Sequence, residues 1–408
     1  MDTAKGLYLY DIIDIKGLLA KETQGSGNYH IAFTISDSFL YVADYKVKSR
    51  YMDTVFLYKI NLENKNEVIK TSLSVKGLGI IDFMDIKPIN DTLFYLLSRT
   101  GIIKIKWIDK QSEIVYHTEI PSNSKRFLPT ELQIINDSLL LLGSNAGGMY
   151  QNFYSGKYLP AAYSFFQTNT NTLLEVNPAV YIKGTGFIDL NNHCFLCVLD
   201  SHVVYSNGIN YTLTVKNTFI PTATNVIHKN ITDPYWVGVD TAYINYINTL
   251  SRYLHSDEIY HAYDSLDLYI SNINKILPVQ GVKNKFIVFL EYGTQMMKHR
   301  QYEKGTIDVY EIKDNQFSLI NENIPYPGNT AMQDTVDNKH HRVYIFDEMR
   351  FSENYAVFFQ GELADDELKA INLSKKGNIT KSDYYALRKK KMEEGKPLIK
   401  QFYVYKYY

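Results

Sequence analysis

One short phrase recurs along the chain: a polar turn, usually Asn or Asp followed by Ser or Thr, leads directly into four or five apolar residues. The clearest copies contain Asp37, Asp91 and Asp137, so their intervals are 54 and 46 residues. Weaker copies follow at 191–193, 283–285 and 353–354. A period of about 40 to 55 residues, built of short strands and turns, is typical of the blades of a β-propeller.

The interior of each repeat also has the pattern of a blade. The apolar run after the turn is nearly continuous, as expected for a strand that is buried on both faces. A second run alternates apolar and polar residues, as expected for a half-exposed strand. Examples of this second run are 55–60, 102–107, 163–166 and 306–312. A further turn and a more polar strand complete each unit, which predicts four antiparallel strands per unit.

We therefore predict an all-β protein with the fold of a β-propeller and a single domain over residues 1–408. Hydrophobic residues make up 45% of the chain and aromatic residues 14%, which is enough for a large core. Seven blades are favoured, because residues 236–247 and 266–270 can supply one degenerate blade. If residues 241–274 are instead a helical insertion, the count falls to six.

The two ends of the chain are expected to pair. Residues 7–13 form an apolar run that belongs to none of the repeats, and residues 401–408 read as a third blade strand with no sequence left for a fourth. A propeller has to protect the edges of its first and last blades. We therefore predict that residues 7–13 form the outermost strand beside residues 401–407 and close the ring.

One segment has a helical pattern. Residues 362–373 carry apolar residues at helical spacing, and Ser382 can cap a second helix that ends before Gly395 and Pro397. We expect residues 362–396 to be a helical insertion in the last blade and a place where a partner can dock. The basic run at 388–391 is interpreted as a solvated helix face that complements the helix dipole.

No motif for a cofactor or a metal stands out. Cys194 and Cys197 lie within an apolar strand, where residues three apart face opposite sides, so we interpret them as small core residues with free thiols. The adjacent His340 and His341 lack a partner at metal-ligand spacing. Asp91 and Asp137 precede strands and are interpreted as structural turn residues rather than catalytic acids. We therefore expect no cofactor and no metal.

The charge and hydropathy of the chain limit the partners and the cellular locations that the sequence predicts. The 43 basic and 44 acidic residues give a net charge of −1, so no overall field attracts nucleic acid. No stretch is apolar enough for a membrane span or a signal peptide, which predicts a cytoplasmic protein, or an exported one if Met1 replaces a removed leader. The loop over 145–156 is rich in Gly, Asn and aromatic residues, and its candidate ligand contacts are Asn145, Tyr150, Asn152 and Tyr154.

The style of the repeats resembles the TolB-like β-propeller proteins of Bacteroidetes. The resemblance lies in the run 39–44 followed by 55–60, and in the run 355–361 followed by 401–405. It covers most of the chain but includes no diagnostic motif. The resemblance implies a six-bladed ring that is usually exported or lipid-anchored. As written, this sequence departs from that family pattern in having no export signal and, if seven blades are present, in having one extra blade.

Two main classes of function remain open. The favoured hypothesis is a non-enzymatic propeller that binds a protein or glycan partner through one face of the ring. The alternative is a hydrolase or lyase with its site at the mouth of the central channel. Clustered titratable residues at that mouth would favour an enzyme. A structural subunit of a larger assembly is a third hypothesis, which large apolar patches on the outside would favour.

Overall fold

The computed structural model describes residues 6–14, 31–45, 53–64, 66–80, 83–98, 100–120, 127, 129–145, 161–180, 195–206, 211–220, 223–232, 269–295, 301–302, 304–314, 316–325, 333–336, 339–343, 348–362 and 399–407. These residues form strands and no helix. Consequently, none of the described elements is a helix long and apolar enough to cross a membrane. The helical insertion expected at 362–396 and the alternative helical insertion at 241–274 lie outside the described residues, except that Glu362 ends one strand and residues 269–274 begin another. The alternative is therefore wrong for residues 269–274, which are not helical.

Three sheets in the first half of the chain are antiparallel and follow the sequence order of their strands. The first consists of β2 (Ile31–Ser36), β3 (Phe39–Tyr45), β4 (Thr54–Asn61) and β5 (Val68–Ser74). The second consists of β6 (Phe83–Pro88), β7 (Leu93–Ser98), β8 (Gly101–Ile108) and β9 (Gln111–Glu119). The third consists of β10 (Glu131–Asn136), β11 (Leu139–Asn145) and β12 (Ala161–Gln167), with β13 (Thr172–Leu173) and β14 (Asn177–Val180) both paired to β12.

The second half of the chain continues this arrangement. A fourth sheet consists of β15 (Phe195–Val198), β16 (His202–Ser206), β17 (Thr212–Asn217) and β18 (Thr224–His228). An eight-stranded sheet has the order β1-β28-β27-β26-β19-β20-β22-β23. Its strands are β1 (Leu7–Asp14), β19 (Tyr269–Gln280), β20 (Lys285–Gln295), β22 (Lys304–Lys313), β23 (Gln316–Pro325), β26 (Glu348–Ser352), β27 (Tyr355–Glu362) and β28 (Ile399–Tyr407). A small sheet contains β21 (Gln301–Tyr302), β25 (Lys339–Val343) and β24 (Gln333–Val336).

The eight-stranded sheet is two antiparallel four-stranded units joined edge to edge. The join is a short parallel pairing of β19 with β26, in which Val279 faces Phe351 and Gln280 faces Ser352. One unit is therefore β19-β20-β22-β23, and the other is β26-β27-β28-β1. Parallel pairing is expected where the first strands of two neighbouring propeller-like units meet, because those strands run in the same direction.

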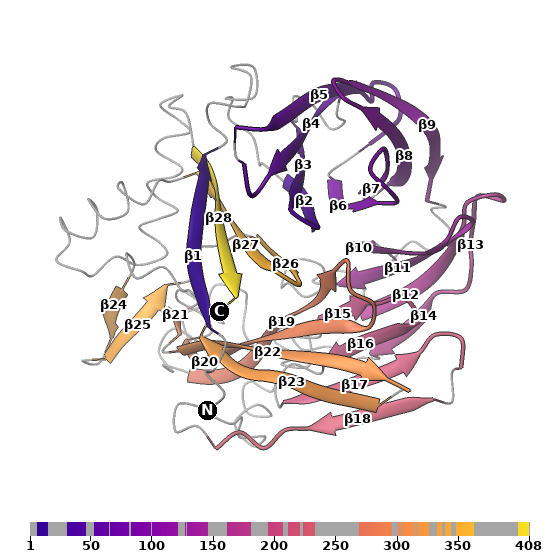
Figure 1. Cartoon of the computed structure of the whole chain (residues 1–408). Coiled ribbons are helices and arrows are strands. Elements are labelled where there is room, and N and C mark those ends of the chain that lie inside the picture. Colours follow the sequence, from indigo (N-terminus) through magenta and orange to yellow (C-terminus); the bar gives the residue numbers. More distant parts are fainter. Residues whose placement is uncertain are drawn as a thin grey trace, which may run out of the picture.

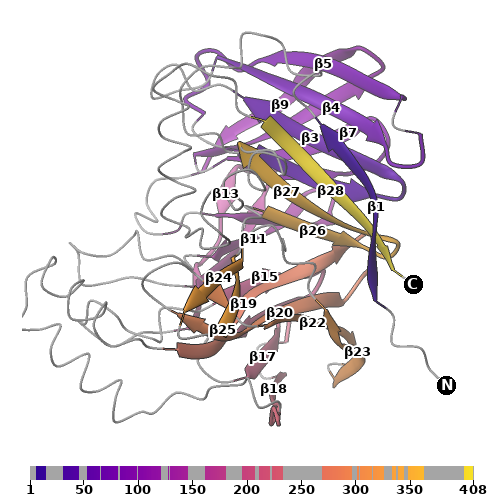
Figure 2. The same cartoon turned by 90° about the vertical axis from the view of Figure 1, so that its left-hand side faces the viewer.

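The sheets are arranged around a common centre. Figure 1 shows β2, β6, β10, β15, β19 and β26 near the centre, with β5, β9, β13, β18, β23 and β1 at the periphery. We call the first group the inner strands and the second group the outer strands. In the side view of Figure 2, β26 and β27 lie between β3 and β4 above and β19 and β20 below, so the last unit in the sequence adjoins the first sheet. The observed architecture is therefore all-β and propeller-like.

Each sheet packs against its neighbour through buried side chains. Between the first and second sheets, Tyr41, Phe94 and Trp107 are in aromatic contact, with ring centroids 5.0 to 6.3 Å apart. Similar clusters lie between each later pair of sheets. A further cluster packs Val357 and Phe402 of β27 and β28 against Phe33 of β2. Burial of these faces is the main force that holds the sheets together.

The strand patterns read from the sequence agree with the observed burial. All residues of β7 except the first are buried, as expected for a strand enclosed on both faces. By contrast, β9 alternates exposed and half-buried residues along most of its length, because it is an outer strand. The four-strand unit predicted from the repeats is thus present in the described residues.

The pairing predicted between the two ends of the chain is also present. β1 runs antiparallel to β28, from Leu7 opposite Tyr407 to Asp14 opposite Gln401, and it lies at the edge of its sheet. Figure 2 shows the two strands side by side. Of the β1 side chains described, Ile13 alone is buried, so β1 covers the edge of β28 mainly through its backbone.

The turn chemistry differs from the prediction by one residue. The side-chain oxygen Oδ1 of Asn90 accepts hydrogen bonds from the backbone N–H groups of Thr92 and Leu93, and Oδ1 of Asn136 accepts one from the N–H of Ser138. The Asn residues therefore hold these two turns. Asp91 and Asp137, which we had interpreted as the turn-forming residues, are exposed at the tips.

Candidate functional site

Charged side chains gather on the inner strands at the centre of the molecule. Asp85 and Lys87 are two residues apart on β6, so they share one face of the strand, while the intervening Ile86 enters the core between the first two sheets. Glu131 begins β10, and Arg350 lies on β26. Clustered titratable side chains of this kind are a candidate catalytic site.

Asp85 and Lys87 bond to other sheets. The Asp85 carboxylate accepts hydrogen bonds from the N–H of Ile86 and from the N–H of Leu132 on β10, both at 3.0 Å. The Lys87 ammonium donates to the side-chain oxygen of Gln280 on β19 at 2.6 Å and lies 3.9 Å from Asp85. Lys87 is only 7% exposed, so these contacts replace its hydration.

Glu131 repeats the arrangement of Asp85 one sheet further on. Its carboxylate accepts a hydrogen bond from the N–H of Val198 on β15 at 3.1 Å. Burial raises the pKa of Glu131 to about 8, and the nearby Asp85 acts in the same direction. The Val198 N–H, Arg350 and Lys87 oppose this rise in pKa. On the same strand, Gln133 donates to Asp200 at 2.6 Å, which adds a second polar link to the fourth sheet.

A further charged group joins β19 to β26. Glu348 lies 3.6 Å from the Lys275 ammonium and 3.4 Å from the Arg350 guanidinium. Although burial opposes it, these two cations lower the pKa of Glu348. The Arg350 guanidinium also lies over the ring of Phe33 on β2, 5.3 Å from its centroid. Arg350 thus links the last unit to the first sheet.

The central charges therefore serve as contacts between sheets. Titratable groups do cluster at the centre, which by itself would favour an enzyme, but each of those described above bonds to a neighbouring sheet or to another charge. Within the described ranges, no group of three His, Cys, Asp or Glu residues is placed to hold a metal ion. Cys197 is buried in β15, and burial raises its thiol pKa well above the usual value, which fits a core residue rather than a nucleophile.

A second buried network joins the fourth sheet to β22. The Asp308 carboxylate accepts hydrogen bonds from the Tyr211 hydroxyl at 2.8 Å, from the Lys229 ammonium at 2.7 Å and from the Asn323 N–H at 2.9 Å. Asp308 is completely buried. Burial, together with the charge of Asp308, raises the pKa of Tyr211. This network also has the character of a structural contact, because its donors and acceptors satisfy one another.

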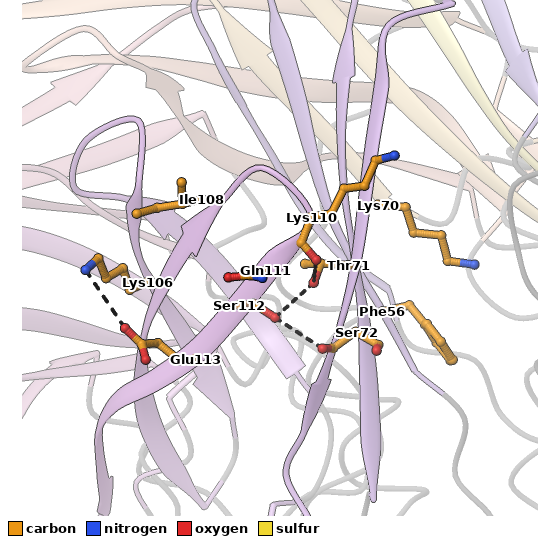
Figure 3. Close-up of a pocket in the computed structure, with 10 residues that line it drawn as sticks. All are labelled: Phe56, Lys70, Thr71, Ser72, Lys106, Ile108, Lys110, Gln111, Ser112 and Glu113. Atoms are coloured by element: carbon orange, nitrogen blue, oxygen red, sulfur yellow. Dashed lines mark hydrogen bonds and ion pairs between the residues drawn. The ribbon is translucent and has the colours of Figure 1, made fainter.

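The strongest candidate for a binding site lies at the periphery instead. A cleft of about 740 Å³ spans the outer strands β5 and β9 (Figure 3). Both strands are the last of their sheets, so no other strand of the described residues pairs with their outer edges. The cleft is lined by Phe56, Lys70, Thr71, Ser72, Lys106, Ile108, Lys110, Gln111, Ser112 and Glu113. We call this feature the β5–β9 cleft.

Hydroxyl groups connect the two strands across the middle of the β5–β9 cleft. The Thr71 hydroxyl donates to the carbonyl of Lys110 at 3.0 Å and lies 3.2 Å from the Ser112 hydroxyl. Ser112 donates to the carbonyl of Ser72, also at 3.2 Å. These bonds, drawn in Figure 3, hold two edge strands together where no backbone ladder joins them. They fix the spacing of the groups on either side.

The two flanks of the cleft carry cations and apolar side chains. On one flank, the Lys70 ammonium lies over the ring of Phe56, 5.1 Å from its centroid. On the other, Lys106 lies 3.9 Å from Glu113 with both side chains largely exposed, and Ile108 is 47% exposed. Figure 3 shows Lys70 and Phe56 on the opposite side of the Thr71–Ser112 contact from Lys106 and Glu113. Such a surface can bind an anionic ligand with apolar groups.

The structure does not test the ligand contacts predicted in the loop over 145–156. Asn145 is the last residue of β11, and Tyr150, Asn152 and Tyr154 lie outside the described residues. The side chains of His340 and His341 on β25 also lie outside them. The β5–β9 cleft was missed by the sequence analysis. The available signal was the alternation of Lys104 and Lys106 with Ile and Trp, which marks a strand with one cationic face.

Comparisons with known proteins leave the function open. No family model matches the chain, and no curated protein matches it. A luciferin-regenerating enzyme aligns with 97% of this chain and 94% of its own at 8% identity, with a TM-score of 0.41. The N-terminal domain of Nup159 aligns with 88% of this chain and 79% of its own at 10% identity, with a TM-score of 0.32. A functionally unknown protein from Desulfotomaculum acetoxidans aligns with 82% of this chain and 75% of its own at 9% identity, with a TM-score of 0.35.

These values are too low for any property of those proteins to be transferred to this chain. The resemblance to TolB-like proteins of Bacteroidetes stays a prediction, since none of the three comparisons bears on it.

Proposed function

We propose that the protein is a six-bladed, closed propeller that acts as a binding module without catalytic activity of its own. The six blades are the four sheets formed by the strands from β2 to β18 and the two halves of the eight-stranded sheet. Support for closure comes from the pairing of β1 with β28 and from the buried cluster that packs β27 and β28 against β2.

The partner docks in the β5–β9 cleft. This proposal rests on one observation: the charged side chains at the centre are already bonded to other parts of the protein, whereas two lysines at the cleft are exposed. Lys87 and Asp85 at the centre are buried and bonded across sheets. Lys106 on β8 and Lys110 in the turn between β8 and β9 are exposed at the cleft, beside the exposed Ile108. A partner can reach the second set of groups without disturbing the contacts that hold the sheets together.

Capture experiments with paired variants test this function. The Lys106→Glu, Lys110→Glu double variant reverses two cleft charges that are exposed, and Lys313→Glu is the matched control on β22, away from the cleft. Immobilised wild-type protein and both variants are incubated with lysate of the source organism, and the captured proteins are identified by mass spectrometry. We expect at least one partner that the double variant loses and the control keeps. Identical capture by the double variant and wild type would contradict the proposal.

A hydrolase or lyase with its site at the centre is the second candidate. One observation favours it: Glu131 has a pKa near 8 and lies in the electrostatic reach of Arg350 and Lys87. A carboxyl group that stays protonated near neutral pH is a typical general acid. Turnover of an ester, phosphoester or glycoside substrate that Glu131→Gln abolishes would favour this candidate over the binding module.

A further inference from the structure

The β5–β9 cleft has a positive charge that the chain as a whole lacks. Its lining includes three ammonium groups, on Lys70, Lys106 and Lys110, and one carboxylate, on Glu113, which leaves a local charge of +2 (three minus one). The net charge of the whole chain is −1. The Lys106–Glu113 pair is exposed and 3.9 Å apart, so Glu113 neutralises Lys106 only weakly.

The cleft also offers apolar contacts and backbone groups. Phe56 is half-buried beneath the Lys70 ammonium, and Ile108 is 47% exposed on the other flank. β5 and β9 have no strand on their outer sides among the described residues. The edge of a sheet presents unpaired N–H and C=O groups at strand spacing, which a peptide in an extended conformation can use.

We infer that the β5–β9 cleft binds an extended, acidic segment of a partner protein that carries at least one apolar side chain. This inference rests on the docking function proposed above. Carboxylates of the segment pair with the exposed Lys106 and Lys110, and an apolar side chain packs on Phe56 or Ile108. Because Thr71 and Ser112 hold the two strands together, the backbone that carries Lys110 is in place before the partner arrives, which lowers the entropy lost on binding.

The same surface fits other polymers less well. Binding of nucleic acid depends on many phosphate contacts and an extended field of Lys and Arg, whereas this cleft has three cations. A neutral glycan could accept hydrogen bonds from the lysines but has no negative charge to pair with them. An acidic peptide uses the lysines, the apolar side chains and the strand edges together.

Synthetic peptide pools test the inference with the full-length protein. Three fluorescein-labelled pools of about 12 residues alternate apolar residues with acidic, neutral polar or basic ones, matching the two-residue period of a strand. Fluorescence anisotropy measures their binding at about 20 mM and 200 mM salt. We expect the acidic pool to bind best, with affinity that falls about fivefold or more as salt increases. An acidic pool with Ser in place of the apolar residues should bind more weakly.

The variants decide where the acidic pool binds. The Lys106→Glu, Lys110→Glu double variant should weaken binding by about tenfold or more, roughly 1.4 kcal/mol at 25 °C, while Lys313→Glu should leave it unchanged. Equal binding of the neutral or basic pool, or full binding by the double variant, would overturn the inference. Tighter binding of single-stranded DNA of similar length, lost in the double variant, would overturn it in favour of a nucleic-acid partner.

The two proposals fail in different ways. If the double variant loses a partner from lysate but no pool shows a preference for acidic residues, docking at the cleft stands and the acidic peptide is wrong. If capture from lysate is also unchanged by the double variant, the docking function itself is wrong. Circular dichroism and thermal unfolding of both variants confirm that they are folded, as expected for exposed positions.

Discussion

The centre and the periphery of this molecule use the same residue types for opposite purposes. Lys87 at the centre is 7% exposed and donates to Gln280 at 2.6 Å, whereas Lys106 at the periphery is exposed and lies 3.9 Å from Glu113. A buried charge is costly unless it is bonded, so its partners become part of the fold. An exposed pair contributes little to stability and remains available to a ligand. Burial, more than residue type, separates the structural charges from the candidate binding groups.

The outer strand β1 provides the most severe test of this contrast, because it is peripheral yet its backbone pairs along the edge of β28. We expect deletion of residues 1–14 to cost more than about 5 kcal/mol of unfolding free energy, given about 1 kcal/mol for each backbone hydrogen bond lost. The bare edge of β28, with Tyr405 and Tyr407, should promote aggregation. Light scattering and urea unfolding measure both effects.

Deletion of residues 1–5 alone is the control, since it leaves β1 whole. A protein without residues 1–14 that stays monomeric and equally stable would show that β1 does not close the ring.

Lys229 has two acidic partners, the buried Asp308 and the exposed Glu322. Lys229 lies 2.7 Å from the buried Asp308 and 3.0 Å from Glu322, whose side chain is 53% exposed. We expect Asp308→Ala to lower the unfolding free energy by about 3 to 5 kcal/mol, because Lys229 and the Tyr211 hydroxyl lose a buried acceptor. Glu322→Ala should change it by less than about 0.5 kcal/mol. Similar effects of the two substitutions in chemical denaturation would refute the contrast.

Glu131 makes the stability of the centre dependent on pH. Its pKa rises from 4.5 to about 8 on folding, so the folded protein binds this proton more tightly than the unfolded chain. The associated stabilisation is complete below pH 4.5 and is lost as pH rises to about 8. Since Glu131 retains some exposed surface, we expect a loss on the order of 2 kcal/mol, at about 1.4 kcal/mol per pKa unit.

Urea unfolding of wild-type protein and Glu131→Gln at several pH values measures this dependence. The Gln side chain keeps an acceptor for the Val198 N–H but cannot ionise, so its stability should vary less over this range. An unchanged pH dependence in Glu131→Gln would assign the effect to other groups.

Much of the fold could be predicted from the sequence because local pattern determines it. Buried strands such as β7 are continuous apolar runs, and outer strands such as β9 alternate, so the repeat was visible without the structure. The pairing of β1 with β28 followed from counting strands at the two ends. The number of blades did not follow, because residues 233–268 lack a clear pattern and lie outside the described residues.

The candidate site could not be predicted in the same way. The β5–β9 cleft brings together residues about 40 positions apart, Thr71 with Ser112 and Lys70 with Lys110, and no linear motif records that proximity. The central charges were equally hidden, since Lys87 meets Gln280 across 193 residues. The turns show a subtler limit: Asn and Asp both suit such positions, so the sequence alone did not reveal which residue makes the bonds.

The smallest expected effect on stability is at the turn between β6 and β7. It compares two neighbouring residues, Asn90 and Asp91, of which only one makes the bonds of the turn. Oδ1 of Asn90 accepts hydrogen bonds from the N–H groups of Thr92 and Leu93, while Asp91 is exposed at the tip. We expect Asn90→Ala to lower the unfolding free energy by about 1 kcal/mol, as for loss of a local side-chain cap. Asp91→Ala should change it by less than about 0.5 kcal/mol. A larger loss in Asp91→Ala than in Asn90→Ala, measured by urea unfolding, would restore the original assignment of the turn to the aspartate.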